Sequence, residues 1–443
     1  MGMRVWLRRE VYRALTSPHR RERRRQRAEA KRQRLGEPHR VHYFHRPEDP
    51  VCALMAPLAA GLCERFDIEL DVHLVAPPAA DVNPDPARLP GHARRDTAAL
   101  ARRYDLPFTD PGHEPDTELA ARAARIITAA LGNGDAIQAA IATGEALWRR
   151  DDAGMTAAAA GFGEAKTKAT ALATQSGTAL RDQLGHFQSG TLYYAGEWYW
   201  GADRLHYLET RLAKLGASRA SKPPASLAPP PLESRMSGDC HGAALEIYPS
   251  LRSPYTYLAM ERAFALADRW NARAEIRFVL PMVMRSLPVP RRKGVYFMLD
   301  AKREAERLGL PFGDVCDPLG RPTERGLAVL HHAVQQGEAQ GRAFLLSFLR
   351  GVWAEGVDAG SDLGLRRLVE RAGLDWSAAR AALEDDAWRE IAEANRERLL
   401  ELGLWGVPSF HTGELAVWGQ DRLWQVEDEL SRQAEPQAME QRQ

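Results

Sequence analysis

The second half of the chain carries the apolar pattern of a βαβ unit. Residues Ala244–Tyr248 are rich in β-forming side chains and predict a strand. From residue 254 to about residue 271, the apolar positions suit one buried side of a helix: Leu258, Phe264, Leu266, Ala267 and Trp270. A second strand is expected at residues 275–280. Together these segments predict a strand, a helix and a second strand.

The pattern changes after this unit. A long helical stretch with glycine-containing breaks is expected from about residue 323 to residue 402. Two short strands follow at 409–411 and Leu415–Trp418, joined by a turn at Thr412-Gly413, and a helix comes last. A βαβ half, a helical insertion, and a hairpin with a final helix make up the layout of a thioredoxin-like α/β fold.

The first half of the chain repeats the second. Residues 41–108 align without a gap on residues 245–312, at an offset of 204, with 16 identities in 68 positions. Residues 184–209 align on residues 402–427 at an offset of 218, so the second copy has 14 extra residues in its middle. Self-similarity of this kind predicts two tandem units of one fold, each with a helical insertion.

These alignments divide the chain into five parts. We expect a basic arm at 1–40, a diverged thioredoxin-like domain at 41–216, a Pro/Ser/Ala-rich linker at 217–242, a second thioredoxin-like domain at 243–432, and a tail at 433–443.

The charge and the cysteine content of the chain bear on its binding partners and its cellular compartment. The formal net charge is only +1, so the protein as a whole has no electrostatic attraction to nucleic acid or to an anionic membrane. Nine Arg or Lys residues lie between His19 and Leu35; a solvated helix is expected there, and binding to RNA or an anionic membrane surface is the alternative. We find no apolar run long enough to span a bilayer and no CxxC among four cysteines, so we expect a cytoplasmic protein.

Four motifs in the second half resemble one known family. In chain order they read SPYTYLA, RRKGVYFMLDAKREAERLGLPF, ERLLELGLWGVPSF and WGQDRL. They resemble the 2-hydroxychromene-2-carboxylate isomerases and kappa-class glutathione transferases, in the DsbA-like branch of thioredoxin folds, over about residues 243–432. The resemblance implies glutathione as cofactor. Because related single-copy enzymes commonly form dimers, it also implies that the two domains pack as an internal pseudo-dimer.

Ser253 is the candidate catalytic residue. Ser253-Pro254 stands where the chain turns from strand to helix, and this pair is also what an ordinary capped helix start requires. In the resembled enzymes a Ser at this position faces the thiol of glutathione. A helix N-terminus favours an anion, and a hydroxyl can donate a hydrogen bond to a thiolate. Without a cysteine pair, the site cannot carry out dithiol exchange itself.

The resemblance also implies four further groups around glutathione. Val407 and Pro408 correspond to the cis-proline segment, where the backbone of Val407 would pair with the cysteinyl unit. Gln420 and Asp421 correspond to the pair that receives the γ-glutamyl end; a helix cap by Asp421 is the alternative, and both roles can coexist. Lys293 matches a lysine that would hold a substrate carboxylate, and a solvated lysine in a basic loop is the alternative.

The first copy lacks these residues, so we expect it to be structural. At the positions of Ser253, Lys293, Pro408 and Gln420 it carries Asp49, Leu89, Gly190 and Ala202. A fixed carboxylate at Asp49 would repel a thiolate. Cys52, at the position of Thr256, is expected to be buried rather than reactive.

We predict no metal site, since His331-His332 and Asp239-Cys240-His241 have no partners at useful spacing. The sequence therefore favours a glutathione-dependent isomerase or transferase that acts on a small electrophilic substrate, aromatic compounds included. The alternatives are a non-catalytic binding or scaffold protein of this fold, and a thiol-disulfide oxidoreductase that lacks CxxC.

Overall fold

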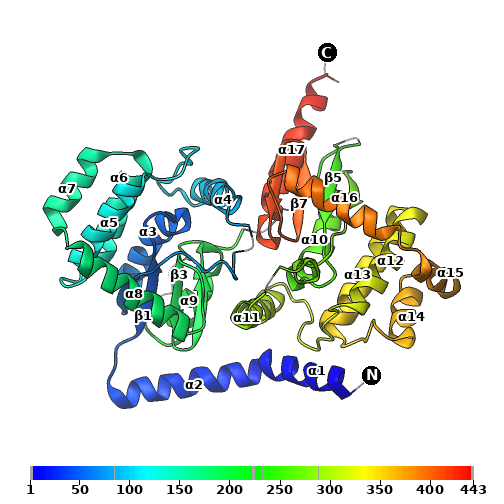
Figure 1. The fold of residues 1–443 in the computed structure, drawn as a ribbon, viewed down its shortest axis with the longest axis horizontal. Coiled ribbons are helices and arrows are strands. Elements are labelled where there is room, and N and C mark those ends of the chain that lie inside the picture. Colours follow the sequence, from blue (N-terminus) through cyan, green and yellow to red (C-terminus); the bar gives the residue numbers. More distant parts are fainter. Residues whose placement is uncertain are drawn as a thin grey trace. The chain divides into compact units, whose positions relative to one another are not determined.

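The computed structural model describes residues 3–440 except 84, 222–224, 232, 235, 241 and 288. Contacts divide the chain into two compact units (Figure 1). The N-terminal unit comprises residues 21–230, and the C-terminal unit comprises residues 231–443 together with residues 1–20. Within the described residues, no helix is long and apolar enough to cross a membrane.

A four-stranded sheet in the order β2-β1-β3-β4 forms the centre of the N-terminal unit. Its strands are β1 (Arg40–His45), β2 (Glu69–Leu74), β3 (Thr191–Tyr194) and β4 (Glu197–Trp200). Helix α3 (Pro50–Arg65) connects the parallel strands β1 and β2, whereas β3 and β4 form an antiparallel hairpin. The helices of the insertion are α4 (Leu89–Tyr104), α5 (Thr117–Ala130), α6 (Ala136–Arg149), α7 (Asp152–Phe162) and α8 (Thr167–Gln183). The short helix η1 (Ala202–Arg204) and α9 (Leu205–Lys214) follow β4.

The C-terminal unit has a sheet in the order β6-β5-β7-β8. Its strands are β5 (Ala244–Tyr248), β6 (Arg273–Ile276), β7 (Ser409–Thr412) and β8 (Leu415–Trp418), and α10 (Pro254–Arg269) connects the first two. The insertion contains η2 (Met282–Arg285), α11 (Arg291–Arg307), α12 (Arg321–Gln336), α13 (Glu338–Ala354), α14 (Asp362–Arg371), α15 (Trp376–Ala381), η3 (Ala382–Glu384) and α16 (Trp388–Glu401). The short helix η4 (Gln420–Arg422) and α17 (Leu423–Glu440) come last.

Two elements differ from the prediction. The second strand, expected at 275–280, runs from Arg273 to Ile276. The backbone N–H groups of Arg277 and Val279 still donate to carbonyls at and just after the end of β5. Helix α11 lies before the predicted helical stretch. Its buried side chains include charged ones, namely Lys293, Asp300, Arg303 and Glu304, which obscure the apolar period on which the prediction relied.

The two sheets pair their strands in the same register. His42 of β1 lies opposite Tyr193 of β3, and the residues at offsets of 204 and 218, Glu246 and His411, lie opposite each other in the second sheet. The same offsets relate the β1–β2 register to β5–β6 and the β3–β4 register to β7–β8. The fold is therefore mixed α/β with two four-stranded sheets that are consistent with thioredoxin-like units.

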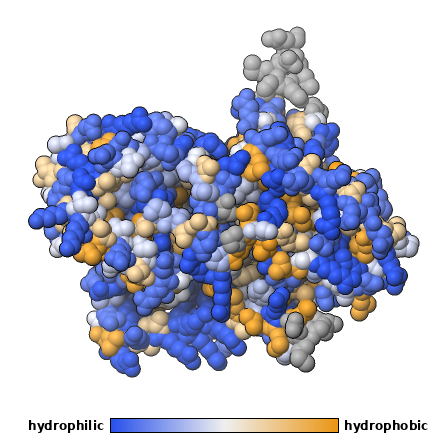
Figure 2. All heavy atoms as spheres, in the orientation of Figure 1, coloured by the Kyte–Doolittle hydropathy of each residue, from blue (hydrophilic) through white to orange (hydrophobic). Residues whose placement is uncertain are grey.

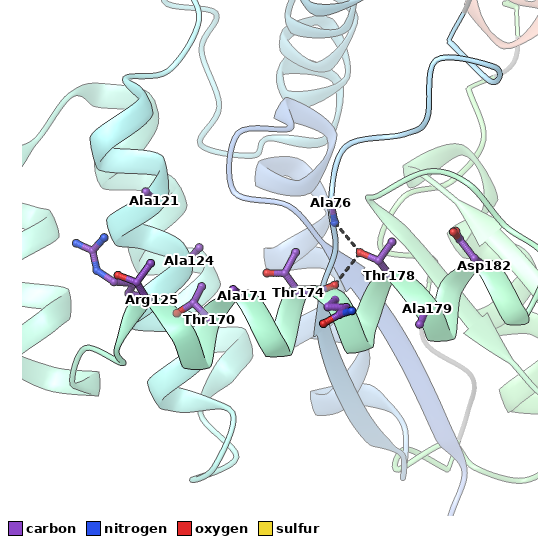
Figure 3. Close-up of a pocket in the computed structure, with 12 residues that line it drawn as sticks. Ala76, Ala121, Ala124, Arg125, Thr170, Ala171, Thr174, Thr178, Ala179 and Asp182 are labelled. Carbon is purple, nitrogen blue, oxygen red and sulfur yellow. Dashed lines mark hydrogen bonds between the residues drawn. The ribbon is translucent and has the colours of Figure 1, made fainter.

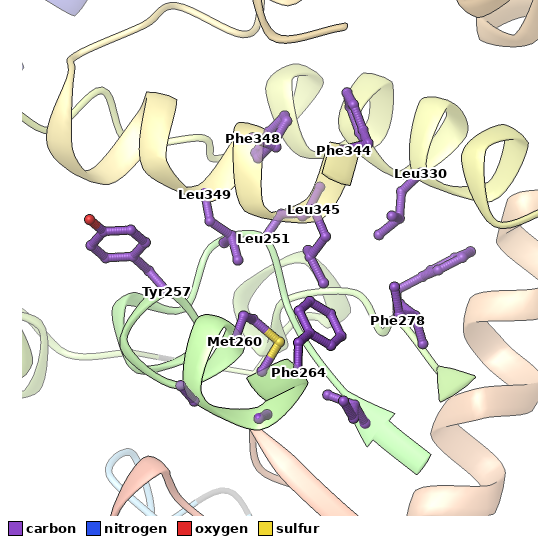
Figure 4. Packing of buried hydrophobic residues seen from close by; sticks show 14 of the residues in the cluster. Leu251, Tyr257, Met260, Phe264, Phe278, Leu330, Phe344, Leu345, Phe348 and Leu349 are labelled. Atoms are coloured by element: carbon purple, nitrogen blue, oxygen red, sulfur yellow. The ribbon is translucent and has the colours of Figure 1, made fainter. Parts of the chain in front are cut away.

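The core of the C-terminal unit forms between α10 and the insertion. Figure 4 shows Leu345 and Leu349 of α13 pointing toward Met260 and Phe264 of α10, and all four side chains are buried. Burial of such side chains contributes roughly 1.5–3 kcal/mol each. Gly326 permits α12 to approach closely, because a Cβ atom there would lie 2.5 Å from the ring of Phe348.

The N-terminal arm consists of two helices, α1 (Met3–Leu15) and α2 (Pro18–Leu35). Helix α1 packs on the C-terminal unit, where Arg9 and Arg13 both form ion pairs with Asp314. The highly basic α2 has no buried residue. The face drawn in Figure 2 is mostly hydrophilic. Three of the exposed large hydrophobic residues lie on α1: Trp6, Leu7 and Val11.

Candidate active site

Ser253 is the N-cap of α10. Its φ and ψ of −100° and 118° are extended, and its Oγ accepts a hydrogen bond from the backbone N–H of Thr256 at 3.2 Å. No described residue accepts a hydrogen bond from the Ser253 hydroxyl in turn, and the side chain is partly exposed. The hydroxyl therefore lies at the positive end of a 16-residue helix.

The loop before Ser253 is fixed by its own hydrogen bonds. The N–H of Ser253 donates to the carbonyl of Ser250 at 3.0 Å, and the N–H of Ser250 donates to the buried Oγ1 of Thr256 at 3.3 Å. Thr256, at the inner position of a cysteine pair in disulfide oxidoreductases, thus ties the loop to the helix. The cap is held in place by bonds that include no thiol.

Val407 and Pro408 lie at the same end of the sheet. The predicted cis geometry of the Val407–Pro408 peptide bond is confirmed. Ser409, the next residue, lies opposite Tyr248 in the β5–β7 pair, and Tyr248 ends the strand that leads to Ser253. The carbonyl of Pro408 accepts from the N–H of Gly419 at 2.9 Å. The topology therefore brings two predicted parts of the site, the Ser253 loop and the Val407-Pro408 segment, to one edge.

Lys293 is buried on α11 and lies near the start of α10 through aromatic contacts. Its Nζ atom is 5.7 Å from the centroid of the Phe297 ring, and that ring meets Tyr255 edge-on with centroids 5.7 Å apart. Tyr255, two residues after Ser253, donates from its hydroxyl to Asp300 at 2.8 Å. The alternative of a solvated Lys293 is excluded, because this side chain is only 7% exposed.

Gln420 and Asp421 form a buried polar network rather than a pair of open ligands. Gln420 is 1% exposed; its Oε1 accepts from Arg262 at 2.7 Å and its Nε2 donates to Glu304 at 3.0 Å. Its amide also donates to Asp421, which is partly exposed. Gln420 is thus fully engaged within the protein, and Asp421 is the member of the pair that solvent reaches.

Helix α1 contributes to the surroundings of Ser253. Arg252, the neighbouring residue, donates two hydrogen bonds to Asp317, at 2.8 and 3.0 Å. The hydroxyl of Tyr12 on α1 donates to the same carboxylate at 3.4 Å. Burial, reinforced by Asp317, raises the pKa of Tyr12 to about 12, so this hydroxyl remains a donor. This contact could not be predicted from local patterns, because its partners are 305 residues apart.

The corresponding position of the N-terminal unit is closed. Asp49 caps α3 by accepting from the N–H of Val51 at 3.0 Å, and it also accepts from the hydroxyl of Ser189. Asp49 and Ser189 are 7% and 1% exposed. Arg46 lies 3.8 Å from the Asp49 carboxylate and donates to the Ser189 hydroxyl at 3.4 Å. The carboxylate is therefore satisfied internally.

All four cysteines are free thiols, and none is activated. Burial raises the pKa of each: Cys52, Cys63, Cys240 and Cys316, the last to about 12. The expectation that Cys52 is buried is confirmed. Thiolates are the reactive form of cysteine, so this protein offers no ready nucleophilic sulfur of its own.

Two hollows in the described part of the chain lie away from the predicted residues. One of about 710 Å³ lies between α5 and α8 of the N-terminal unit, with walls of alanine and threonine (Figure 3). Another of about 560 Å³ lies beside Asn271 and Arg342. Neither includes any predicted site residue. A separate cluster of His42, Asp71 and His73 was missed, because spacing along the sequence does not reveal neighbours across strands.

Comparisons with known proteins agree with the geometry of the C-terminal unit. Residues 244–431 match the DSBA-like thioredoxin domain. The chain is 26% identical over 196 residues to the 2-hydroxychromene-2-carboxylate isomerase of Pseudomonas putida, covering 42% of this chain and 94% of the relative. It is 24% identical over 198 residues to the isomerase of the same name from Pseudomonas sp. (strain C18), covering 43% and 91%.

Two solved structures are also similar. That of a 2-hydroxychromene-2-carboxylate isomerase is 25% identical, with a TM-score of 0.38, and covers 44% of this chain and 98% of its own. The cytosolic disulfide reductase DsbM from Pseudomonas aeruginosa, crystallised with GSH, is 21% identical, with a TM-score of 0.34 and coverage of 44% and 99%. The C-terminal half of the chain is a DsbA-like thioredoxin domain. It is homologous to 2-hydroxychromene-2-carboxylate isomerases.

Proposed function

We propose that the C-terminal unit is a glutathione-dependent isomerase or transferase that acts on a small electrophile, with aromatic carboxylates as the first substrates to test. The observation that carries the proposal is the hydroxyl of Ser253. It caps α10 in a domain homologous to isomerases, and no described residue accepts its proton. Bound glutathione would supply a nucleophilic thiolate.

The donor set at the α10 start fits a thiolate. The Ser253 hydroxyl is neutral, so it donates a hydrogen bond to an anion without repelling it. The helix terminus adds a partial positive charge at the same position. Val407 would pair through its backbone with the cysteinyl unit, just before the β5–β7 pairing that starts at Ser409.

Two further groups would orient the remaining parts of the ligands. Lys293, held against Phe297, would attract a substrate carboxylate. Asp421 would accept hydrogen bonds from the γ-glutamyl ammonium group, and Gln420 would act through it, since its buried amide donates to the Asp421 carboxylate. Gln420 is thus a positioning residue.

The alternatives receive less support. A thiol-disulfide oxidoreductase needs a reactive thiolate, whereas the four cysteines are unpaired with raised pKa values. The free thiols also favour a reducing compartment such as the cytoplasm. A scaffold protein needs no hydroxyl donor at a helix start, and it would have no affinity for glutathione.

We infer that the N-terminal unit is a diverged copy of the C-terminal one that has lost this chemistry. The common strand order and the common registers at offsets of 204 and 218 support duplication. The hydrogen bond between the buried Asp49 and Ser189 side chains supports a structural role for the N-terminal unit.

Equilibrium binding of reduced glutathione to the full chain tests the proposal. We expect saturable binding, weakened in Ser253→Ala, because that variant loses the donor to the thiolate. Asp49→Asn is the matched control at the other helix start and should bind as the parent does. A parent chain that binds no glutathione, and turns over no chromene, maleyl or chloro-aromatic substrate in its presence, would leave the scaffold alternative.

A further inference from the structure

Three metal-ligating side chains meet on one face of the N-terminal sheet. In the parallel β1–β2 pair, His42 lies opposite Asp71, and Phe44 lies opposite His73. Because residues two apart in a strand point to the same side, His42, Asp71 and His73 share that face. Their nearest ligand atoms all lie within 4.8 Å of one another, and all three side chains are partly buried.

The distances are close to those of a tetrahedral site. Zinc binds imidazole nitrogen and carboxylate oxygen at about 2.0–2.2 Å, which separates neighbouring ligand atoms by about 3.3 Å in a tetrahedron. His42 Nδ1 lies 3.0 Å from His73 Nε2 and 3.5 Å from the Asp71 carboxylate. These two separations would change by only a few tenths of an ångström on binding an ion, and the third pair, Asp71 and His73, is within 4.8 Å.

The surrounding structure holds this arrangement. The ring of Phe44 stacks on His73 with centroids 5.1 Å apart. Helix α8 passes close to β2 at Gly177, where a Cβ atom would lie 3.1 Å from the Cβ of His73. These contacts, together with the strand register, fix the side chains without help from a ligand, as a preformed site requires.

Two interactions compete with an ion. The imidazoles of His42 and His73 are within hydrogen-bond distance of each other, and that bond would be replaced on binding. Arg40 approaches Asp71 at 3.4 Å, but it is exposed and forms a closer pair with Glu69 at 3.0 Å. The guanidinium can therefore turn to Glu69 when a cation occupies the site.

We propose that His42, Asp71 and His73 form a binding site for a divalent transition-metal ion of the zinc class. Two imidazoles and one carboxylate are borderline ligands that suit Zn²⁺, with Co²⁺ as a spectroscopic substitute. Three protein ligands leave a fourth position for water or another small ligand. The site belongs to the N-terminal unit and does not depend on the proposed chemistry of Ser253.

Metal titration of the tag-free full chain tests this proposal. We expect one Zn²⁺ per chain in competition with a chromophoric chelator, and a visible Co²⁺ spectrum of tetrahedral type. His73→Gln and Asp71→Asn should each weaken Zn²⁺ binding by about 10–100-fold, a range seen even when only the partners of metal ligands are removed. His113→Gln, outside the cluster, is the control and should bind as the parent does.

Thermal melting separates a lost ligand from a lost fold. Zn²⁺ should raise the melting temperature of the parent and of the control, since ligand binding to the native state stabilises it. Asp71→Asn is nearly isosteric, so it should melt near the metal-free parent and gain little from Zn²⁺. The proposal is overturned if the parent binds no Zn²⁺, or if His113→Gln loses binding as much as His73→Gln does.

Discussion

The start of α3 and the start of α10 occupy equivalent positions beside two sheets of the same register. The polar side chain at the start of α3 is hydrogen-bonded within the protein, whereas the one at the start of α10 has a hydroxyl without a protein acceptor among the described residues. At α10, Ser253 presents a hydroxyl whose proton no described residue accepts. At α3, Asp49 is enclosed by Ser189 and Arg46. The same backbone frame thus supports an open donor in one unit and a satisfied carboxylate in the other.

The residue at the start of the third strand reinforces this difference. Where the C-terminal unit has Pro408, the N-terminal unit has Gly190 with a φ of +64°, a conformation that proline cannot adopt. A Cβ atom at Gly190 would lie 2.6 Å from a methyl group of Val51, at the start of α3. In the N-terminal unit, therefore, the segment before the third strand packs tightly against the start of α3. In the C-terminal unit the equivalent helix start presents the Ser253 hydroxyl.

The largest expected effect concerns turnover. Ser253→Ala should lower glutathione-dependent turnover by about 10- to 1000-fold, because it removes one donor to a reacting anion. Asp49→Ala should leave turnover nearly unchanged under conditions where the chain stays folded. Steady-state rates of both variants decide the point. If Asp49→Ala is inactive while Ser253→Ala is not, the active site lies in the N-terminal unit and the C-terminal unit is the structural one.

Stability should respond in the reverse order. Asp49→Ala should lower the unfolding free energy of the N-terminal unit by about 2–4 kcal/mol, because it removes a cap and leaves Arg46 and Ser189 without their buried partner. Ser253→Ala should cost only about 1 kcal/mol in its own unit. Hydrogen exchange resolved along the chain measures the two units separately. Equal losses of unfolding free energy in the two variants would contradict the idea that the buried Asp49 contributes more stability than the partly exposed Ser253.

Acid should weaken the N-terminal unit more than the C-terminal one. Burial lowers the pKa of His45 to about 3, well below its ordinary 6.5. The unfolded chain therefore takes up a proton that the native state refuses. Stability is complete above about pH 6.5 and falls as the pH decreases toward 3, by about 2 kcal/mol at pH 5. His45→Gln should flatten this loss between pH 7 and 5 in hydrogen exchange, and an unchanged slope would exclude His45 as its source.

The smallest effect should come from Lys293. Lys293→Leu introduces the residue that the other unit has at this position, Leu89. It should raise KM for a carboxylate substrate by about tenfold, the equivalent of about 1.4 kcal/mol, and change kcat little. Arg291→Leu, which removes an exposed charge from the same helix, is the control. A similar rise in KM for a neutral substrate would argue against a charge contact.

Local rules predicted much of the C-terminal unit. The cap at Ser253 and the bounds of β5 and β8 follow from local patterns, whereas the cis bond before Pro408 was implied by the family resemblance. Helix α11 escaped prediction because it buries charge. The internal bonding of Gln420 and the meeting of His42 with His73 depend on contacts between distant segments, which neither periodicity nor spacing encodes.

The attachment of α1 has a consequence for protein synthesis. Arg9 and its partner Asp314 are 305 residues apart. At about 5–20 residues per second, a ribosome needs roughly 15–60 s to make the chain between them. During that interval Tyr12 and Arg9 have been made while the carboxylates that hold them have not. Helix α1 can therefore reach its native position only after the segment that carries Asp314 and Asp317 has been made.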